Sequence, residues 1–115
     1  MVFAKRFMAK NNGVPPNFVQ MANYSAVRQY LAAVKRAGTT DADAVGKQLD
    51  GLKFSDFFAR NGYMRPQDHL LIHDMYLAEV LPASQVKTPW AYYKIMKVIP
   101  GEEAYRPLSE VKCKL

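Results

Sequence analysis

The sequence has little of what a disulfide-bonded, membrane-spanning or exported chain needs. It contains one cysteine, Cys113, so no disulfide can form within the chain. No apolar run approaches the roughly 18 residues that a membrane-spanning helix requires. The N-terminal stretch MVFAKRFMAKNNGVPP has no continuous apolar segment of the signal-peptide kind. By itself the chain is expected to stay in the cytoplasm, with Cys113 either a free thiol or paired with a cysteine outside this sequence.

Recognisable catalytic and metal-binding patterns are also absent. The glycines are dispersed and form no phosphate-binding loop, and no serine has a nucleophile-elbow context. His69 and His73 are four residues apart, but Pro66 and the strand-like sequence around them place the two side chains roughly 13 Å apart by the rise of a strand. That separation is too large for one metal ion. The sequence therefore predicts no catalytic residue, no metal site and no cofactor.

The composition is that of one folded domain. The chain has 115 residues, of which 50% are hydrophobic and 23% charged, a balance that argues against disorder. The net charge of +6 permits binding to nucleic acid. The lysines and arginines are scattered, however, which favours a solvated basic surface over a nucleic-acid-binding arm.

Helical patterns fill the first half of the chain. A short helix without a recognisable N-terminal cap ends at Asn11-Asn12-Gly13, and a second extends from Phe18 to Gly38. The second helix carries one apolar stripe, with alanines beside it that allow close packing: Tyr24, Val27, Leu31 and Val34. A third helix is expected to begin at a capping box of Thr40 and Asp43 and to bury Val45, Leu49 and Leu52.

Strand patterns follow, separated by turn signals. Asn61-Gly62 and the segment around Pro66 predict turns, and the ranges 70–81 and 90–99 each predict one strand. Residues 102–115 have no periodicity and predict an irregular tail. The expected fold class is α+β, with three N-terminal helices and then two to four strands. So few strands cannot cover the apolar helix stripes, which predicts a marginally stable or oligomeric species.

An aromatic segment near residue 90 allows two interpretations. Trp90, Tyr92 and Tyr93, with Lys94 and Lys97 beside them, could form a stacking surface for single-stranded nucleic acid. Aromatic residues are equally typical of a half-buried strand, and we favour the strand.

Several motifs in order resemble a known family. They are Phe3-Ala4-Lys5-Arg6-Phe7, Gly13-Val14-Pro15-Pro16, Ala22-Asn23-Tyr24-Ser25-Ala26-Val27, and Ala33-Val34-Lys35-Arg36-Ala37-Gly38-Thr39-Thr40-Asp41. The later segments Phe57–Gly62, His73–Leu77 and Pro89–Cys113 continue the likeness. The chain resembles the C-terminal part of ABC-transporter solute-binding proteins of the branched-chain amino acid (Leu/Ile/Val-binding) type.

The resemblance implies part of a two-lobed α/β fold, in which residues 1–53 are helical, residues 54–100 contain strands that cross the hinge, and residues 101–115 form the tail. It implies a periplasmic, non-catalytic protein that clamps an amino acid or a similar small solute and delivers it to an ABC permease. The start of the second helix would face the ligand cleft, which makes Gln20, Met21 and Tyr24 the candidate ligand-binding residues. Core packing is an equal alternative for Tyr24.

Two other function classes remain open from the residues alone. One is a small basic α+β module that binds nucleic acid. The other is a structural domain that self-associates through exposed strand edges.

Overall fold

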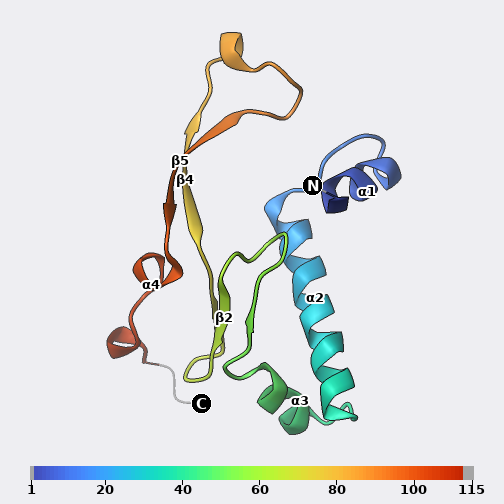
Figure 1. The fold of residues 1–115 in the computed structure, drawn as a ribbon, viewed down its shortest axis with the longest axis vertical. Coiled ribbons are helices and arrows are strands. Elements are labelled where there is room, and N and C mark those ends of the chain that lie inside the picture. Colours follow the sequence, from blue (N-terminus) through green and yellow to red (C-terminus); the bar gives the residue numbers. More distant parts are fainter. Residues whose placement is uncertain (1, 113–115) are drawn as a thin grey trace.

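A long helix lies beside two small antiparallel sheets in the computed structural model, which describes residues 2–112 (Figure 1). The described part of the chain measures 51 × 36 × 18 Å. Its α-helices are α1 (Val2–Lys10), α2 (Phe18–Ala37), α3 (Ala42–Leu49) and α4 (Gly101–Ala104). Its strands are β1 (Lys53–Phe54), β2 (Gly62–Arg65), β3 (Leu70–Ile72), β4 (Met75–Val80) and β5 (Tyr93–Ile99). The predicted α+β class is confirmed, with one strand more than expected because two-residue β1 pairs with β2.

Helix α2 has well-defined ends, as its sequence predicts. The Asn17 side chain accepts a hydrogen bond from the Gln20 N–H, and the Gln20 side chain accepts one from the Asn17 N–H. This is a complete capping box. At the other end, Gly38 adopts a φ of +69° and donates to the carbonyl of Val34. Glycine meets this left-handed conformation without steric cost, so it stops the helix there.

The predicted cap of α3 is wrong by one residue. The side chain of Asp41, not that of Thr40, accepts a hydrogen bond from the Ala44 N–H at 3.0 Å. A carboxylate at this position satisfies a free N–H group and also complements the positive end of the helix dipole, which a hydroxyl does not. The expected burial of Val45 is confirmed, since it is 3% exposed.

The single strand predicted over residues 70–81 is instead two strands in different sheets. Strand β3 is the edge of the three-stranded sheet β1-β2-β3, whereas β4 pairs with β5 in a separate two-stranded sheet. The break falls at His73-Asp74, where the Asp74 N–H donates to the carbonyl of Arg60 and the side chain is buried. This tertiary contact takes Asp74 out of the strand alternation, and the sequence pattern does not reveal it.

The tail is more regular than its sequence predicts. Residues 101–104 form α4, and residues 108–110 form a short 3-10 helix. Gly101 is buried against the His73 backbone, so the chain turns into a helix where the tail packs on the break between the two sheets. Cys113 lies outside the described residues.

The core of this chain is small. Its buried apolar residues are Ala33, Val45, Ala59 and Ile72, and the buried polar ones are Ser25, Arg65 and Asp74. In contrast, Val27 and Leu31 of the apolar stripe on α2 are 57% and 58% exposed. The expectation that the chain has too little sheet to cover its helix stripes is confirmed.

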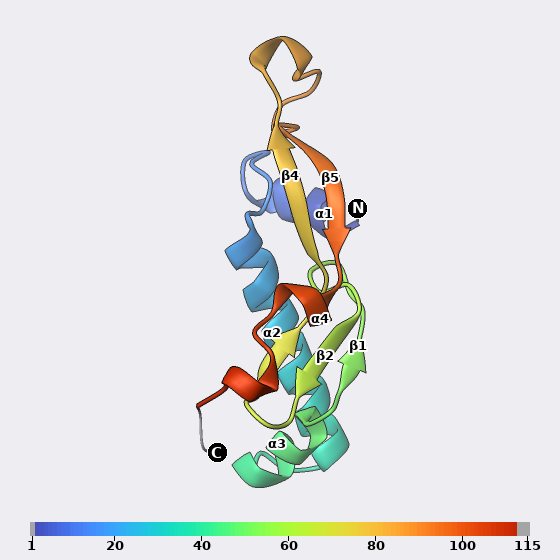
Figure 2. The same cartoon turned by 90° about the vertical axis from the view of Figure 1, so that its left-hand side faces the viewer.

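The β4–β5 hairpin extends beyond the three-stranded sheet, and the loop that joins its two strands forms one end of the molecule, past α1 (Figure 2). All six residues of β4 are exposed, as are residues 93–98 of β5. Trp90 and Tyr92 contact each other edge to face in the loop that joins the strands, and both are about half exposed. The half-buried aromatic strand that we favoured from the sequence is therefore wrong for this chain, because the described residues place nothing over this segment.

Candidate functional site

The start of α2 lies against an aromatic cluster that joins three separate segments. Phe3 of α1 stacks on Phe57, with ring centroids 4.3 Å apart and planes 6° from parallel. The ring of Tyr24 contacts both, at 4.8 Å from Phe3 and 5.6 Å from Phe57. Such pairs add about 0.5–1.5 kcal/mol each beyond the burial of their area. The cluster fixes α1 beside the first turns of α2.

A hollow of about 220 Å³ opens between these two helices. It is lined by three aromatic residues, two cationic residues and one amide, namely Phe3, Phe7, Tyr24, Arg6, Lys10 and Gln20. Aromatic walls with two positive charges at the rim suit a small molecule that has an apolar body and a carboxylate.

The hollow contains two of the three predicted site residues. Gln20 and Tyr24 line it, and Tyr24 is 48% exposed. Met21 is half-buried and is not among the lining residues. The capping box uses the Gln20 side-chain oxygen and N–H and the Asn17 N–H, and the other residues of this first turn, Phe18 and Val19, are not among those that line the hollow.

The sequence interpretation missed the contribution of α1. Arg6 and Lys10 are four residues apart, as are Phe3 and Phe7, so each pair forms a row along the helix. These two adjacent rows, one aromatic and one cationic, were a readable signal. Only the tertiary fold places them opposite Gln20 and Tyr24.

A partly buried hydrogen bond holds α2 in place beside this hollow. The hydroxyl of Ser25, which is 2% exposed, donates to Oδ2 of Asp56 at 2.6 Å. Oδ1 of Asp56 accepts from the N–H groups of Phe58 and Ala59. Burial alone raises the pKa of Asp56, but the hydrogen bonds from Ser25, Ala59, Phe58 and Gln29 together outweigh it and hold that pKa below its usual value.

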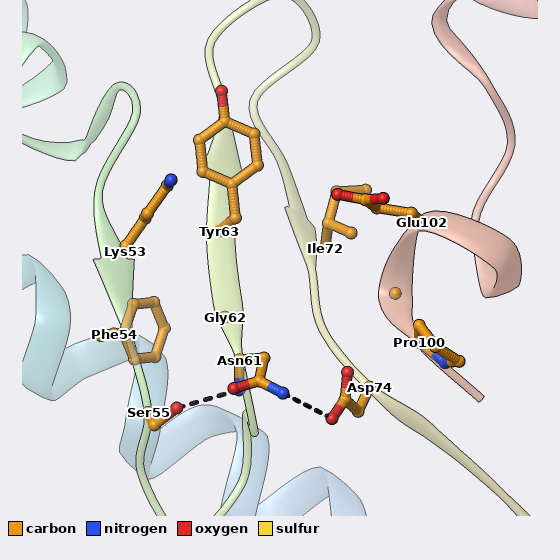
Figure 3. Close-up of a pocket in the computed structure, with 11 residues that line it drawn as sticks. Lys53, Phe54, Ser55, Asn61, Gly62, Tyr63, Ile72, Asp74, Pro100 and Glu102 are labelled. Atoms are coloured by element: carbon orange, nitrogen blue, oxygen red, sulfur yellow. Dashed lines mark hydrogen bonds between the residues drawn. The ribbon is translucent and has the colours of Figure 1, made fainter. Parts of the chain in front are cut away.

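A second, larger hollow of about 930 Å³ lies between the three-stranded sheet and α4 (Figure 3). Its floor is polar, and the polar groups bond to one another. Asn61 donates through Nδ2 to Asp74 at 2.8 Å and through its N–H to the Ser55 hydroxyl at 2.9 Å. Arg60 also pairs with Asp74 at 3.3 Å. Because these groups satisfy each other, the hollow offers a ligand fewer free groups than its polar lining suggests.

The remaining charged contacts serve the fold. Arg65 forms a two-point ion pair with Asp68 and donates to the carbonyl of Arg106, which ties the tail to the β2–β3 turn. The hydrogen bond between them raises the pKa of Arg65 and lowers that of Asp68. His69 lies in the turn with Asp50 3.4 Å away, and His73 lies in the break between β3 and β4. Residues 2–112 contain no group of three or more metal-ligating side chains.

Comparison with known proteins defines the class to which this fold belongs. A family model described as periplasmic binding protein matches residues 1–85. A solved structure of a periplasmic binding protein from Burkholderia mallei is 47% identical, with a TM-score of 0.90 over 96% of this chain. A branched chain amino acid ABC transporter periplasmic ligand-binding protein from Burkholderia xenovorans LB400 is 41% identical, with a TM-score of 0.89 over 97%.

These matches establish the family. The chain belongs to the periplasmic binding protein family, and the resemblance seen in the sequence motifs is confirmed. The chain spans 29% of the length of each of the two solved relatives. No curated protein is similar enough to the chain to count as a match. None of the described helices is both long enough and apolar enough to cross a bilayer.

Proposed function

We propose that this chain is part of the periplasmic, non-catalytic solute-binding component of an ABC transporter, and that the solute is an amino acid or a related small carboxylate. The observation that carries the proposal is the hollow between α1 and α2, in which aromatic side chains and the cations Arg6 and Lys10 meet the start of α2. Family membership and the name of the Burkholderia xenovorans relative support it. An ABC permease is the expected protein partner.

The proposed contacts divide between the two ends of the solute. The carboxylate pairs with Arg6, which lines the hollow together with Lys10. The apolar body packs against the Tyr24 ring, and the Gln20 amide borders the same space. Met21 lies next to Gln20 on α2 but does not line this hollow, so a contact between Met21 and the solute is proposed from the family resemblance alone. The rest of the binding surface belongs to parts of the two-lobed fold outside this segment.

A chimera tests the proposal. The segment of the Burkholderia mallei protein that matches this chain is replaced by the chain itself, which is 47% identical to it. Melting temperature is then measured with each standard amino acid and with a series of small carboxylates. We expect at least one of them to raise the melting temperature, because a ligand that binds only the folded state stabilises it.

The contacts are then checked by substitution in the chimera. Tyr24→Ala and Arg6→Gln are expected to weaken binding by roughly tenfold or more, the loss typical of one well-placed ring or ion pair. Tyr92→Ala is the matched control, because Tyr92 has a similar exposed fraction, 44%, but lies in the loop that joins β4 and β5 and does not line the hollow. If no compound shifts the melting temperature, or if Tyr92→Ala weakens binding as much as Tyr24→Ala, the proposal is wrong.

A further inference from the structure

Most polar groups that line the hollow between α1 and α2 are hydrogen-bond donors. The side chains of Arg6 and Lys10 can donate but not accept. The Gln20 side-chain oxygen already accepts from the Asn17 N–H at 3.0 Å, so the group that Gln20 has left for a ligand is mainly its side-chain NH₂. Such a set of donors suits a carboxylate, whereas an ammonium group needs acceptors.

The segment that builds the hollow is also the positively charged part of the chain. Residues 1–40 contain six of the 16 lysines and arginines and none of the ten acidic residues, so they account for the whole net charge of +6. Within residues 2–112, neither Arg6 nor Lys10 forms a salt bridge. The two cations of the hollow are therefore available to an anionic ligand, and the charge of the surrounding segment attracts one.

The apolar lining of the hollow consists of aromatic rings. The Phe3 ring centroid lies 6.1 Å from that of Phe7 and 4.8 Å from that of Tyr24, and both pairs are tilted. Phe57 stacks on Phe3 and holds that ring in place. Aromatic pairs of this geometry, with centroids about 4.5–7 Å apart, gain more than their buried area provides, so one more ring extends the cluster better than an aliphatic chain does. At about 220 Å³ the hollow suits a single ring with a short acid chain.

We infer that the solute is an aromatic carboxylate without an α-ammonium group, which rests on the function proposed above and narrows it. The ring of the solute packs against Phe3, Phe7 and Tyr24, and its carboxylate pairs with Arg6 and Lys10. An amino acid fits less well, because its ammonium group is bonded next to its carboxylate and is held close to both cations. A cation–π contact with Tyr24 favours the ammonium group, but the two positive charges oppose it.

Four ligands that differ by one group at a time test the inference in the chimera described above. They are phenylalanine, leucine, and the carboxylates that remain when the ammonium group is removed from each, hydrocinnamate and isocaproate. Dissociation constants are measured by isothermal titration calorimetry at neutral pH. We expect hydrocinnamate to bind roughly tenfold or more tightly than phenylalanine, because it lacks the like-charge contact. It should also bind about three- to tenfold more tightly than isocaproate, the effect of one aromatic pair.

Substitutions in the chimera assign these preferences to the hollow. Lys10→Gln should reduce the preference for hydrocinnamate over phenylalanine by about threefold or more, because one repelling charge is lost. Lys35→Gln is the control, since Lys35 is an exposed lysine in the last turn of α2 and does not line the hollow. Phe7→Leu should reduce the preference for hydrocinnamate over isocaproate. Phe18→Leu is its control, since Phe18 is 76% exposed and does not line the hollow.

The outcomes separate this inference from the function on which it rests. If phenylalanine or leucine binds more tightly than its counterpart without the ammonium group, the inference is wrong and the proposed function stands. The same holds if isocaproate binds as tightly as hydrocinnamate, or if the control substitutions change the two preferences as much as Lys10→Gln and Phe7→Leu do. If none of the four ligands and none of the wider series binds, the proposed function itself is wrong, and the inference fails with it.

Discussion

The Ser25 hydroxyl donates a 2.6 Å hydrogen bond to Oδ2 of Asp56, and this bond joins α2 to the loop that follows β1. The two residues are 31 positions apart. Asp56 also holds its own loop together by accepting from the N–H groups of Phe58 and Ala59. Phe57, which follows Asp56 in sequence, stacks on Phe3, so the same loop supports the wall of the candidate site.

Removing the hydroxyl should destabilise the chain. We expect Ser25→Ala to cost ~1–2 kcal/mol in the free energy of unfolding, because the bond reaches a charged acceptor that remains partly solvated. Urea unfolding followed by circular dichroism measures this cost. Ser84→Ala is the control, since Ser84 is exposed in the 3-10 helix at residues 83–85. An equal effect of both substitutions would show that the bond has no specific role.

The same contact predicts how stability depends on pH. The folded pKa of Asp56 lies below its unfolded value, so its contribution is complete above the unfolded pKa of about 4. The contribution is lost as the pH falls through the folded pKa. Ser25→Ala removes one cause of the lowered pKa and should flatten the decline in stability below pH 4. Unfolding curves at several pH values between 2 and 6 measure the slope, and an unchanged slope in the variant would contradict the assignment.

Gly101 is required where the tail meets the break between the two sheets. A Cβ atom there would lie 2.7 Å from Cγ2 of Ile72 and 3.0 Å from the backbone of His73. Gly101→Ala should therefore lower the free energy of unfolding by ~1–3 kcal/mol, because the added methyl group overpacks this contact. Gly46→Ala is the opposite case, because no atom lies within 4 Å of its Cβ position in α3, and a gain of about 0.5–1 kcal/mol is expected from helix propensity. Urea midpoints of the two variants should move in opposite directions.

Asn61 combines a turn conformation with a bond to a buried carboxylate. Its φ is +52°, and its side chain donates to Asp74 at 2.8 Å. Asn61→Gly preserves the turn but removes the hydrogen bond to Asp74. This loss should lower the free energy of unfolding by ~1–3 kcal/mol. Asn12→Gly is the matched control, because Asn12 has a φ of +49° in an exposed turn and should change stability by less than about 0.5 kcal/mol. Similar losses in the two variants would assign the effect to the turn alone.

Local signals predicted the helices well. The Gly38 stop, the start of α2 and the burial of Val45 follow from propensity and capping, which act over a few residues. The Asn17 and Gln20 capping box was equally readable, and the Thr40 cap was wrong because a carboxylate stood next to it. The family also followed from ordered motifs, since many weak matches in sequence order are jointly specific.

Contacts between residues far apart in sequence determined the features that the sequence did not predict. The break at Asp74 depends on Arg60 and Asn61, and the turn of the tail into α4 depends on the fit of Gly101 against Ile72. The candidate site likewise needs α1 to lie beside α2, which the Phe3–Phe57 stack achieves. The sequence by itself determined helices α1 to α3, the α+β class and the family, because periodicity and capping are local. Only the tertiary structure decided which face of α2 this chain covers, because that choice depends on small side chains packing against residues far along the chain.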